Sequence, residues 1–200
     1  MFPISHFNIT RTPFYYYDKT LLSNTLAKLI RLAGERNYHI HYAVKANANP
    51  EILKLIAASG IGADCVSGGE IKAALEAGFP AKKIVFAGVG KADWEIEYAL
   101  EKKIFCFNVE SAEELSVIEE LAKKKENIAS IALRINPNID AHTHEYITTG
   151  LSENKFGIPI EMLDSIFSQI QRSPHVQLVG FHFHIGSQIL NLETFHVLCE

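Results

Sequence analysis

A lysine, Lys45, stands at the end of a short apolar run in the segment HYAVKAN (41–47), where a charged side chain is not expected. Lysine side chains often extend from a strand end into solvent, which gives this position an ordinary structural explanation. A lysine amine that is withdrawn from water is more available in its neutral, nucleophilic form, and it can bond to a carbonyl compound as an imine. The residues at neighbouring strand ends decide between these two interpretations.

Polar side chains of several chemical types stand near the ends of the other apolar runs. We expect five of them at levels equivalent to Lys45, namely Asp64, Arg134, His182, His184 and Ser187. An amine, a carboxylate, a guanidinium, imidazoles and a hydroxyl around one cavity are typical of a small-molecule site.

Two pairs of histidines raise the alternative of a metal site. His182 and His184 share one face of a strand, as two ligands do in barrel metallohydrolases, and His142 and His144 repeat this spacing in the loop NIDAHTHEYITTG (138–150). In such enzymes the pair usually lies on the first strand and further ligands follow, whereas here it comes late. We therefore predict no metal ion, and we interpret the 138–150 loop as a mobile segment close to the substrate.

Short β-branched or aromatic runs alternate with longer segments of helical periodicity, which predicts repeated strand–helix units. Equivalent positions of the first four runs are 21 residues apart, which suits one strand, one helix and two short loops. Pro50 after Asn49, and Ser111 with Glu114, predict helix starts with a proline and a capping box. The predicted strands cover 40–44, 61–66, 84–89, 104–109, 131–136 and 179–185, and the predicted helices cover 19–37, 50–59, 69–77, 91–102, 111–125 and 160–172.

Two folds give this alternation, a doubly wound sheet and a (β/α)8 TIM barrel. In the fifth run Arg134 lies opposite Leu133, and in the sixth His182 lies opposite Phe181. One face is therefore apolar, while the other turns polar near the carboxyl ends, which favours a barrel because strands of a doubly wound sheet are apolar on both faces. We predict an α/β fold with the first six βα units of a (β/α)8 barrel. Since a closed barrel needs eight strands, we expect this chain to be the N-terminal part of a longer protein.

Composition excludes several classes of function. The chain has 200 residues, 48% of them hydrophobic, and a net charge of -4, with its basic residues scattered, so we predict no nucleic-acid partner. Its three cysteines have no paired spacing, which indicates a reducing, cytoplasmic location. No run reaches the roughly 18 apolar residues of a membrane span. The segment GVGK (88–91) lacks the first glycine and the hydroxyl residue of a Walker A phosphate loop.

Seven segments, in this order, resemble the fold-type III pyridoxal-phosphate-dependent decarboxylases, whose barrel is of the alanine racemase type. They span nearly the whole chain, and their order makes a chance match implausible. These segments are PFYYYD (13–18), YAVKAN (42–47), GADCVSGGEI (62–71), FAGVGK (86–91), LRINPNI (133–139), KFGI (155–158) and HFHIGSQI (182–189).

The resemblance implies a cofactor, pyridoxal 5'-phosphate, and a role for each site residue. Lys45 would bond to the cofactor aldehyde as an imine (a Schiff base), and His184 would stack on the pyridine ring. Ser187 would donate a hydrogen bond to the phosphate, while Asp64 and Arg134 would lie beside the ring.

The resemblance further implies decarboxylation of a small amino acid by a homodimer. The motifs FAGVGK and HFHIGSQI favour meso-diaminopimelate as substrate, with L-lysine and carbon dioxide as products, as in the last step of lysine biosynthesis. In the family the glycine-rich phosphate loop, the acidic partner of the pyridine nitrogen and a catalytic cysteine lie in the later half, so we expect these 200 residues alone to be inactive. We expect residues 1–18 to join a β-domain that is absent here, and residues 19–200 to form the partial, cofactor-binding barrel.

Three alternatives stay open. The substrate could be ornithine, arginine or carboxynorspermidine, because the first half of the family does not separate these enzymes. The protein could be a non-catalytic relative that binds pyridoxal phosphate, or a barrel metallohydrolase with bound metal and no imine.

Overall fold

The computed structural model describes residues 3–137, 156–187 and 189–199, and the chain divides into two compact units, Met1–Tyr38 and His39–Glu200. The first unit contains helices α1 (Ile4–Phe7) and α2 (Lys19–Gly34). The side chain of Asp18 caps α2 by accepting a hydrogen bond from the backbone of Leu21. None of the helices in the described part of the chain is long and apolar enough to cross a membrane.

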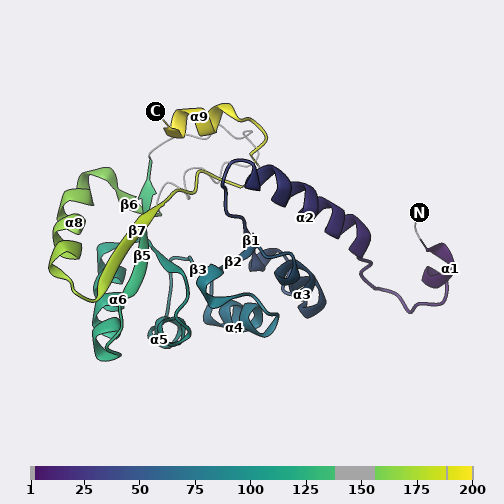
Figure 1. The fold of residues 1–200 in the computed structure, drawn as a ribbon, viewed down its shortest axis with the longest axis horizontal. Helices are drawn as coiled ribbons and strands as arrows, with labels where there is room; N and C mark the ends of the chain where they lie inside the picture. Colours follow the sequence, from purple (N-terminus) through teal and green to yellow (C-terminus); the bar gives the residue numbers. More distant parts are fainter. Residues whose placement is uncertain (1–2, 138–155, 188, 200) are drawn as a thin grey trace. The chain divides into compact units, whose positions relative to one another are not determined.

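The second unit alternates strands and helices along the chain (Figure 1). Its strands are β1 (His41–Ala43), β2 (Gly62–Cys65), β3 (Ile84–Phe86), β4 (Cys106–Val109), β5 (Ala129–Asn136), β6 (Ile158–Pro159) and β7 (Val176–His182). Its α-helices are α3 (Pro50–Ala58), α4 (Gly68–Glu76), α5 (Asp93–Lys102), α6 (Ala112–Lys124), α8 (Leu163–Arg172) and α9 (Glu193–Cys199). Short 3-10 turns are η1 (Val44–Ala46), η2 (Ala81–Lys83) and η3 (Ile160–Met162).

All strands that the structure describes in this unit are parallel, and their order follows the sequence. Strands β1 to β5 pair consecutively, and β7 pairs with β5 over most of its length. A sequential parallel order is that of a TIM barrel, whereas a doubly wound sheet reverses its order at a switch point. The prediction of six βα units of a barrel is therefore confirmed. The two-residue strand β6, which pairs with the carboxyl end of β5 at Ile135, was not predicted, because so short a run carries no periodicity.

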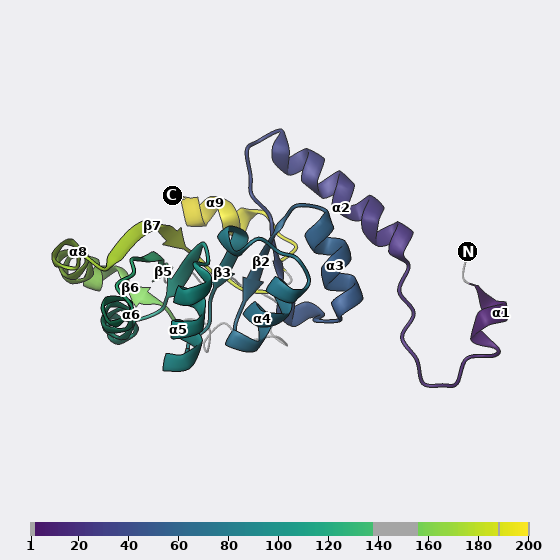
Figure 2. The same ribbon diagram turned by 60° about the horizontal axis from the view of Figure 1, so that its bottom comes forward.

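The apolar face of the sheet is covered by helices. Helix α4 packs against β2 and β3, α6 against β5 and α8 against β7, and Figure 2 shows these helices following one another along one side of the strands. The side chains on this face are among the most buried of the chain, as at Phe86, Phe107 and Leu133. This burial supplies the main driving force for folding of the unit and leaves the opposite face for polar residues.

Local signals in the sequence explain where the helices begin. The side chain of Asn49 accepts hydrogen bonds from the backbone of Glu51 and Ile52, with Pro50 at the first helical position of α3. The side chain of Ser111 caps α6 by accepting from the backbone of Glu114. Both predicted helix starts are confirmed, but the capping box at Ser111 is only half formed, because the Glu114 side chain accepts from the backbone of Glu110 and not from that of Ser111.

Candidate active site

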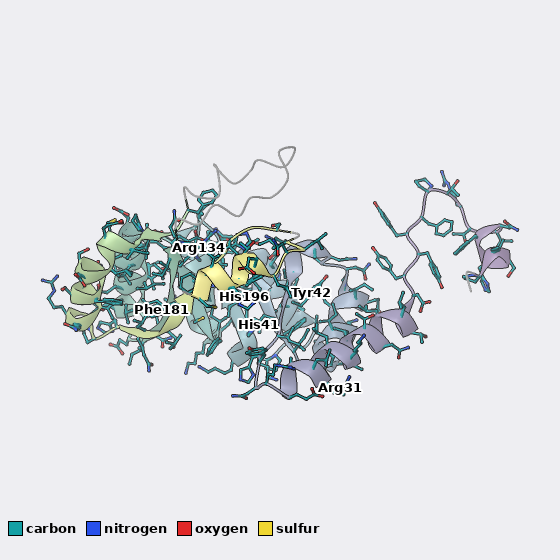
Figure 3. The ribbon with its side chains drawn as sticks, turned by 90° about the horizontal axis from the view of Figure 1, so that it is seen from above. Arg31, His41, Tyr42, Arg134, Phe181 and His196 are labelled. Carbon is teal, nitrogen blue, oxygen red and sulfur yellow. The ribbon has the colours of Figure 1, made fainter. Side chains whose placement is uncertain are left out.

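A cavity of about 360 Å³ lies on the polar, inner face of the sheet. Strands β1, β2, β4 and β7 contribute polar side chains to it. Figure 3 labels two of the lining residues, His41 of β1 and Phe181 of β7. It also labels Arg134 of β5. Parallel strands present their carboxyl ends at one edge, which is where barrel proteins place their sites. The polar and thiol groups that line the cavity belong to His41, Asp64, Cys106, Asn108 and His182.

Lys45 stands directly beyond the carboxyl end of β1. The strand ends at Ala43, which pairs with Asp64, and the chain then turns through η1, so Lys45 lies in a 3-10 turn and not in the strand itself. Val44 is fully buried and anchors this turn, whereas the side chain of Lys45 is exposed. The turn therefore holds the amine at the barrel mouth with access for a reacting molecule.

Asp64 is an acidic group on which the charge of Lys45 acts. Burial raises the pKa of the Asp64 carboxyl above its ordinary value, Lys45 lowers it, and Glu70 raises it further. Its Oδ1 atom is buried and has no hydrogen-bond partner in the part of the chain that the structure describes. A buried carboxylate oxygen without a hydrogen-bond donor lowers the stability of the folded protein. Such an oxygen is typical of a position where a bound ligand supplies the missing donor.

Arg134 is held on the same edge by a buried ion pair. Its Nη1 donates to Oε2 of Glu110 at 2.7 Å, and the two side chains are only 10% and 6% exposed. The guanidinium lies 5.7 Å from the centre of the Phe156 ring. A charge-assisted hydrogen bond in such a buried position fixes the direction of the guanidinium.

His182, His184 and Ser187 come from the end of β7 and the segment that follows it. The strand ends at His182, where it is paired with Arg134, so His184 and Ser187 lie beyond the strand that we predicted to reach residue 185. Burial lowers the pKa of His182 to about 4, with smaller contributions from Arg134, His184 and Lys91. Its Nδ1 atom is buried and finds no partner within the described residues.

The buried cysteines of this edge are not reactive thiols. Burial raises the pKa of Cys65 to about 12 and that of Cys106 to about 11. A nucleophilic cysteine requires a thiolate, so neither residue serves as one at neutral pH.

The sequence analysis did not anticipate the charged contacts that Glu110, Glu114 and Lys91 make at this edge. Lys91 donates to Glu114 at 2.5 Å and has a side chain that is 1% exposed. Glu110 directly follows β4, so its position at a strand end was a signal that we could have used. Lys91 ends the segment GVGK, which we had considered as a phosphate loop and, within FAGVGK, as a family motif, without a role for the lysine itself.

A metal site was the alternative interpretation of the two histidine pairs. Across residues 3–137, 156–187 and 189–199, no group of three or more His, Cys, Asp or Glu side chains is arranged to hold a metal ion. The loop with His142 and His144 lies outside the described residues.

The fold defines a class, an α/β-barrel domain of parallel strands with a cavity on the polar face of its sheet. The family described as "Pyridoxal-dependent decarboxylase, pyridoxal binding domain" matches residues 23–199. The chain belongs to this family.

Relatives that match the chain share a name. A diaminopimelate decarboxylase from Bacteroides thetaiotaomicron is 58% identical over the whole chain, which covers 52% of that relative. One from Helicobacter pylori is 48% identical over 94% of the chain and 46% of its own length. The chain thus spans about half the length of these curated relatives.

Solved structures agree with this assignment. The crystal structure of a mutant diaminopimelate decarboxylase from Helicobacter pylori, complexed with L-lysine, has a TM-score of 0.86 and 44% identity over 98% of this chain and 50% of that one. A diaminopimelate decarboxylase from M. jannaschii in complex with L-lysine has a TM-score of 0.86 and 38% identity over 96% of this chain and 46% of its own.

Proposed function

We propose that this chain is the N-terminal half of a diaminopimelate decarboxylase, which converts meso-diaminopimelate to L-lysine and carbon dioxide. The observation that carries the proposal is the accessible amine of Lys45 at the barrel mouth, beside the buried carboxyl of Asp64, in a chain that belongs to the pyridoxal-dependent decarboxylases. The names of the relatives above support this choice of substrate.

The residues at the site fit pyridoxal phosphate. The amine of Lys45 is accessible and acts on Asp64, a lining residue of the cavity, although Lys45 itself does not line it. The cavity has two buried polar atoms, Oδ1 of Asp64 and Nδ1 of His182, without a partner among the described residues. Lys45 would bond to the cofactor aldehyde, His184 would pack against the ring, and Ser187 would donate to the phosphate. When bound, pyridoxal phosphate accepts the electron pair that the departing carboxylate leaves behind.

The protein's own contribution is binding and orientation. Lys45 would be the residue that holds the cofactor, through its side-chain amine. Asp64 provides an acidic group beside that amine, and its raised pKa allows it to hold a proton more readily than an exposed aspartate. Arg134 places a positive charge on the same edge. These groups orient the scissile bond, and the cavity restricts the access of water.

We further propose that the full-length protein is a cytoplasmic homodimer. A dimer would supply the catalytic cysteine, since burial raises the pKa of Cys65 and of Cys106 and so disfavours a thiolate at either residue. Residues 1–18 would join a β-domain contributed by the rest of the protein. A small-molecule amino acid remains the expected partner.

Carbon dioxide release by the purified full-length protein tests the proposed substrate. We expect release from meso-diaminopimelate in the presence of pyridoxal phosphate, and at most slow release from ornithine, arginine or carboxynorspermidine. Release from one of these others alone would refute the substrate. Binding of pyridoxal phosphate without any release would instead indicate a non-catalytic relative.

A further inference from the structure

Glu110 is a buried carboxylate that the proposed chemistry has not yet used. Its side chain is 6% exposed, and it pairs with Arg134 at 2.7 Å across 24 residues of sequence. Leaving either partner of such a pair alone is strongly unfavourable, so the two groups fix one another. Its second oxygen, Oε1, has no partner in the described part of the chain.

A second ion pair, between Lys91 and Glu114, supports the backbone of Glu110. The backbone N–H of Glu110 donates to Oε2 of Glu114 at 2.8 Å, while Oε1 of Glu114 accepts from Nζ of Lys91 at 2.5 Å. In an ordinary capping box the Glu114 side chain would reach the backbone of Ser111; here it accepts from the residue before it. The position of Glu110 is therefore set by Glu114.

Lys91 connects this arrangement to the rest of the sheet edge. Besides Glu114, its Nζ donates to the carbonyl oxygens of Gly88 at 2.7 Å and Asn108 at 2.9 Å. All three donors of the ammonium group are thus used, and they tie the loop after β3 to the end of β4 and the start of α6. The network is rigid because each of its charged groups has a defined partner.

Arg134 is confined on its other sides as well. Phe156 packs near the guanidinium, and Gly157, at φ +89°, passes so close that a Cβ atom there would lie 3.0 Å from the carbonyl oxygen of Arg134. Across the strand pair Arg134 faces His182, a cavity residue on which its charge acts. A shift of this guanidinium would therefore be felt inside the cavity.

We propose that Glu110 is a positioning residue, which directs the Arg134 guanidinium toward the cofactor site and is itself fixed by the Lys91–Glu114 pair. The inference rests on the proposed function and adds to it a residue that contacts neither cofactor nor substrate. Glu110 acts through Arg134 alone, so its removal should matter only while Arg134 is present.

The test measures the dissociation constant of pyridoxal phosphate by absorbance titration of the full-length apo-protein. We expect Glu110→Gln to raise this constant on the order of tenfold, because small misplacements of a binding group are costly. Glu113→Gln, an exposed carboxylate three residues further along, is the matched control and should stay within about twofold of the wild type. The double variant Glu110→Gln, Arg134→Gln should bind no more weakly than Arg134→Gln alone.

Glu110→Asp provides a second route if Glu110→Gln does not fold. It keeps the charge but shortens the side chain, so we expect a folded protein whose dissociation constant rises several-fold. A dissociation constant equal to that of Glu113→Gln, with only the melting temperature lowered, would overturn the inference and leave Glu110 a structural residue. Failure of the wild type to bind pyridoxal phosphate would instead overturn the proposed function, and the inference with it.

Discussion

Two acidic groups at the same sheet edge have different surroundings. Glu110, after β4, is paired with Arg134 and supported by Lys91 and Glu114. Asp64, at the end of β2, has a buried oxygen without a partner among the described residues and feels Lys45 only through its charge. Each carboxylate thus has one buried oxygen without a partner among the described residues, but of the two only Glu110 is also held there by an ion pair. We infer that Glu110, Arg134, Lys91 and Glu114 form a supporting region, which holds the site in place. Lys45 and Asp64 form a receiving region, which binds the ligand.

The largest effect is expected at the receiving region, on replacing Lys45. Lys45→Ala should lower the rate of decarboxylation by the full-length protein by on the order of 10³-fold or more, because the covalent attachment of the cofactor is lost. Lys54→Ala, an exposed lysine of α3, is the control and should keep full activity. Near-normal turnover by Lys45→Ala would remove the distinction between the two regions.

Substitutions in the supporting region should instead lower the stability of the folded protein. Lys91→Met should lower the free energy of unfolding by about 3 kcal/mol, because Glu114 then stays buried without a counter-charge. The exposed pair Lys54–Glu51 offers the comparison, since Lys54→Met should cost less than about 0.5 kcal/mol. Thermal melting of the cofactor-free protein measures both. Equal small losses would show that the Lys91 pair is no more important than a surface pair.

The stability of the protein should depend on pH through His182, a histidine that lines the cavity. The pKa of His182 is lowered to about 4 in the folded protein, so the unfolded state binds more protons between about pH 6.5 and 4. The stability that neutral His182 contributes is present above that range and is lost as the pH falls through it. By pH 5 the wild type should lose about 2 kcal/mol more than His182→Gln. Parallel melting curves for the two proteins between pH 7 and 5 would contradict this.

The smallest expected effect is a gain in stability at Asp64. Burial raises the pKa of this carboxyl, so keeping it charged at neutral pH costs free energy in the folded state. Asp64→Asn should therefore raise the melting temperature of the cofactor-free protein by on the order of 1 °C, at the cost of ligand binding. A lower melting temperature would mean that the carboxylate is already satisfied in the folded chain.

Much of the fold could be predicted from the sequence because the pattern of each strand is local. The alternation at Leu133 and Arg134 assigned one face to the helices and one to the site, and the burial of Leu133 confirms it. The helix starts at Pro50 and Ser111 were equally local. Lys45 was placed at the end of the first strand, although the turn that carries it was not predicted.

The supporting network could not be predicted, for physical reasons. Glu110 and Arg134 are 24 residues apart and Lys91 and Glu114 are 23 apart, so each pair forms only when neighbouring strands align. Sequence spacing describes one element at a time and does not reveal which charges meet across two of them. The roles of Lys45, Asp64, Arg134, His184 and Ser187 toward the cofactor stay predictions.

Reductive trapping of the full-length protein tests the central claim most directly. Holoprotein purified with pyridoxal phosphate is treated with borohydride, digested and mapped by mass spectrometry. The account predicts a pyridoxyl group on the peptide that contains Lys45 and on no other lysine. A modified lysine elsewhere, or no modification in protein that still decarboxylates meso-diaminopimelate, would contradict it.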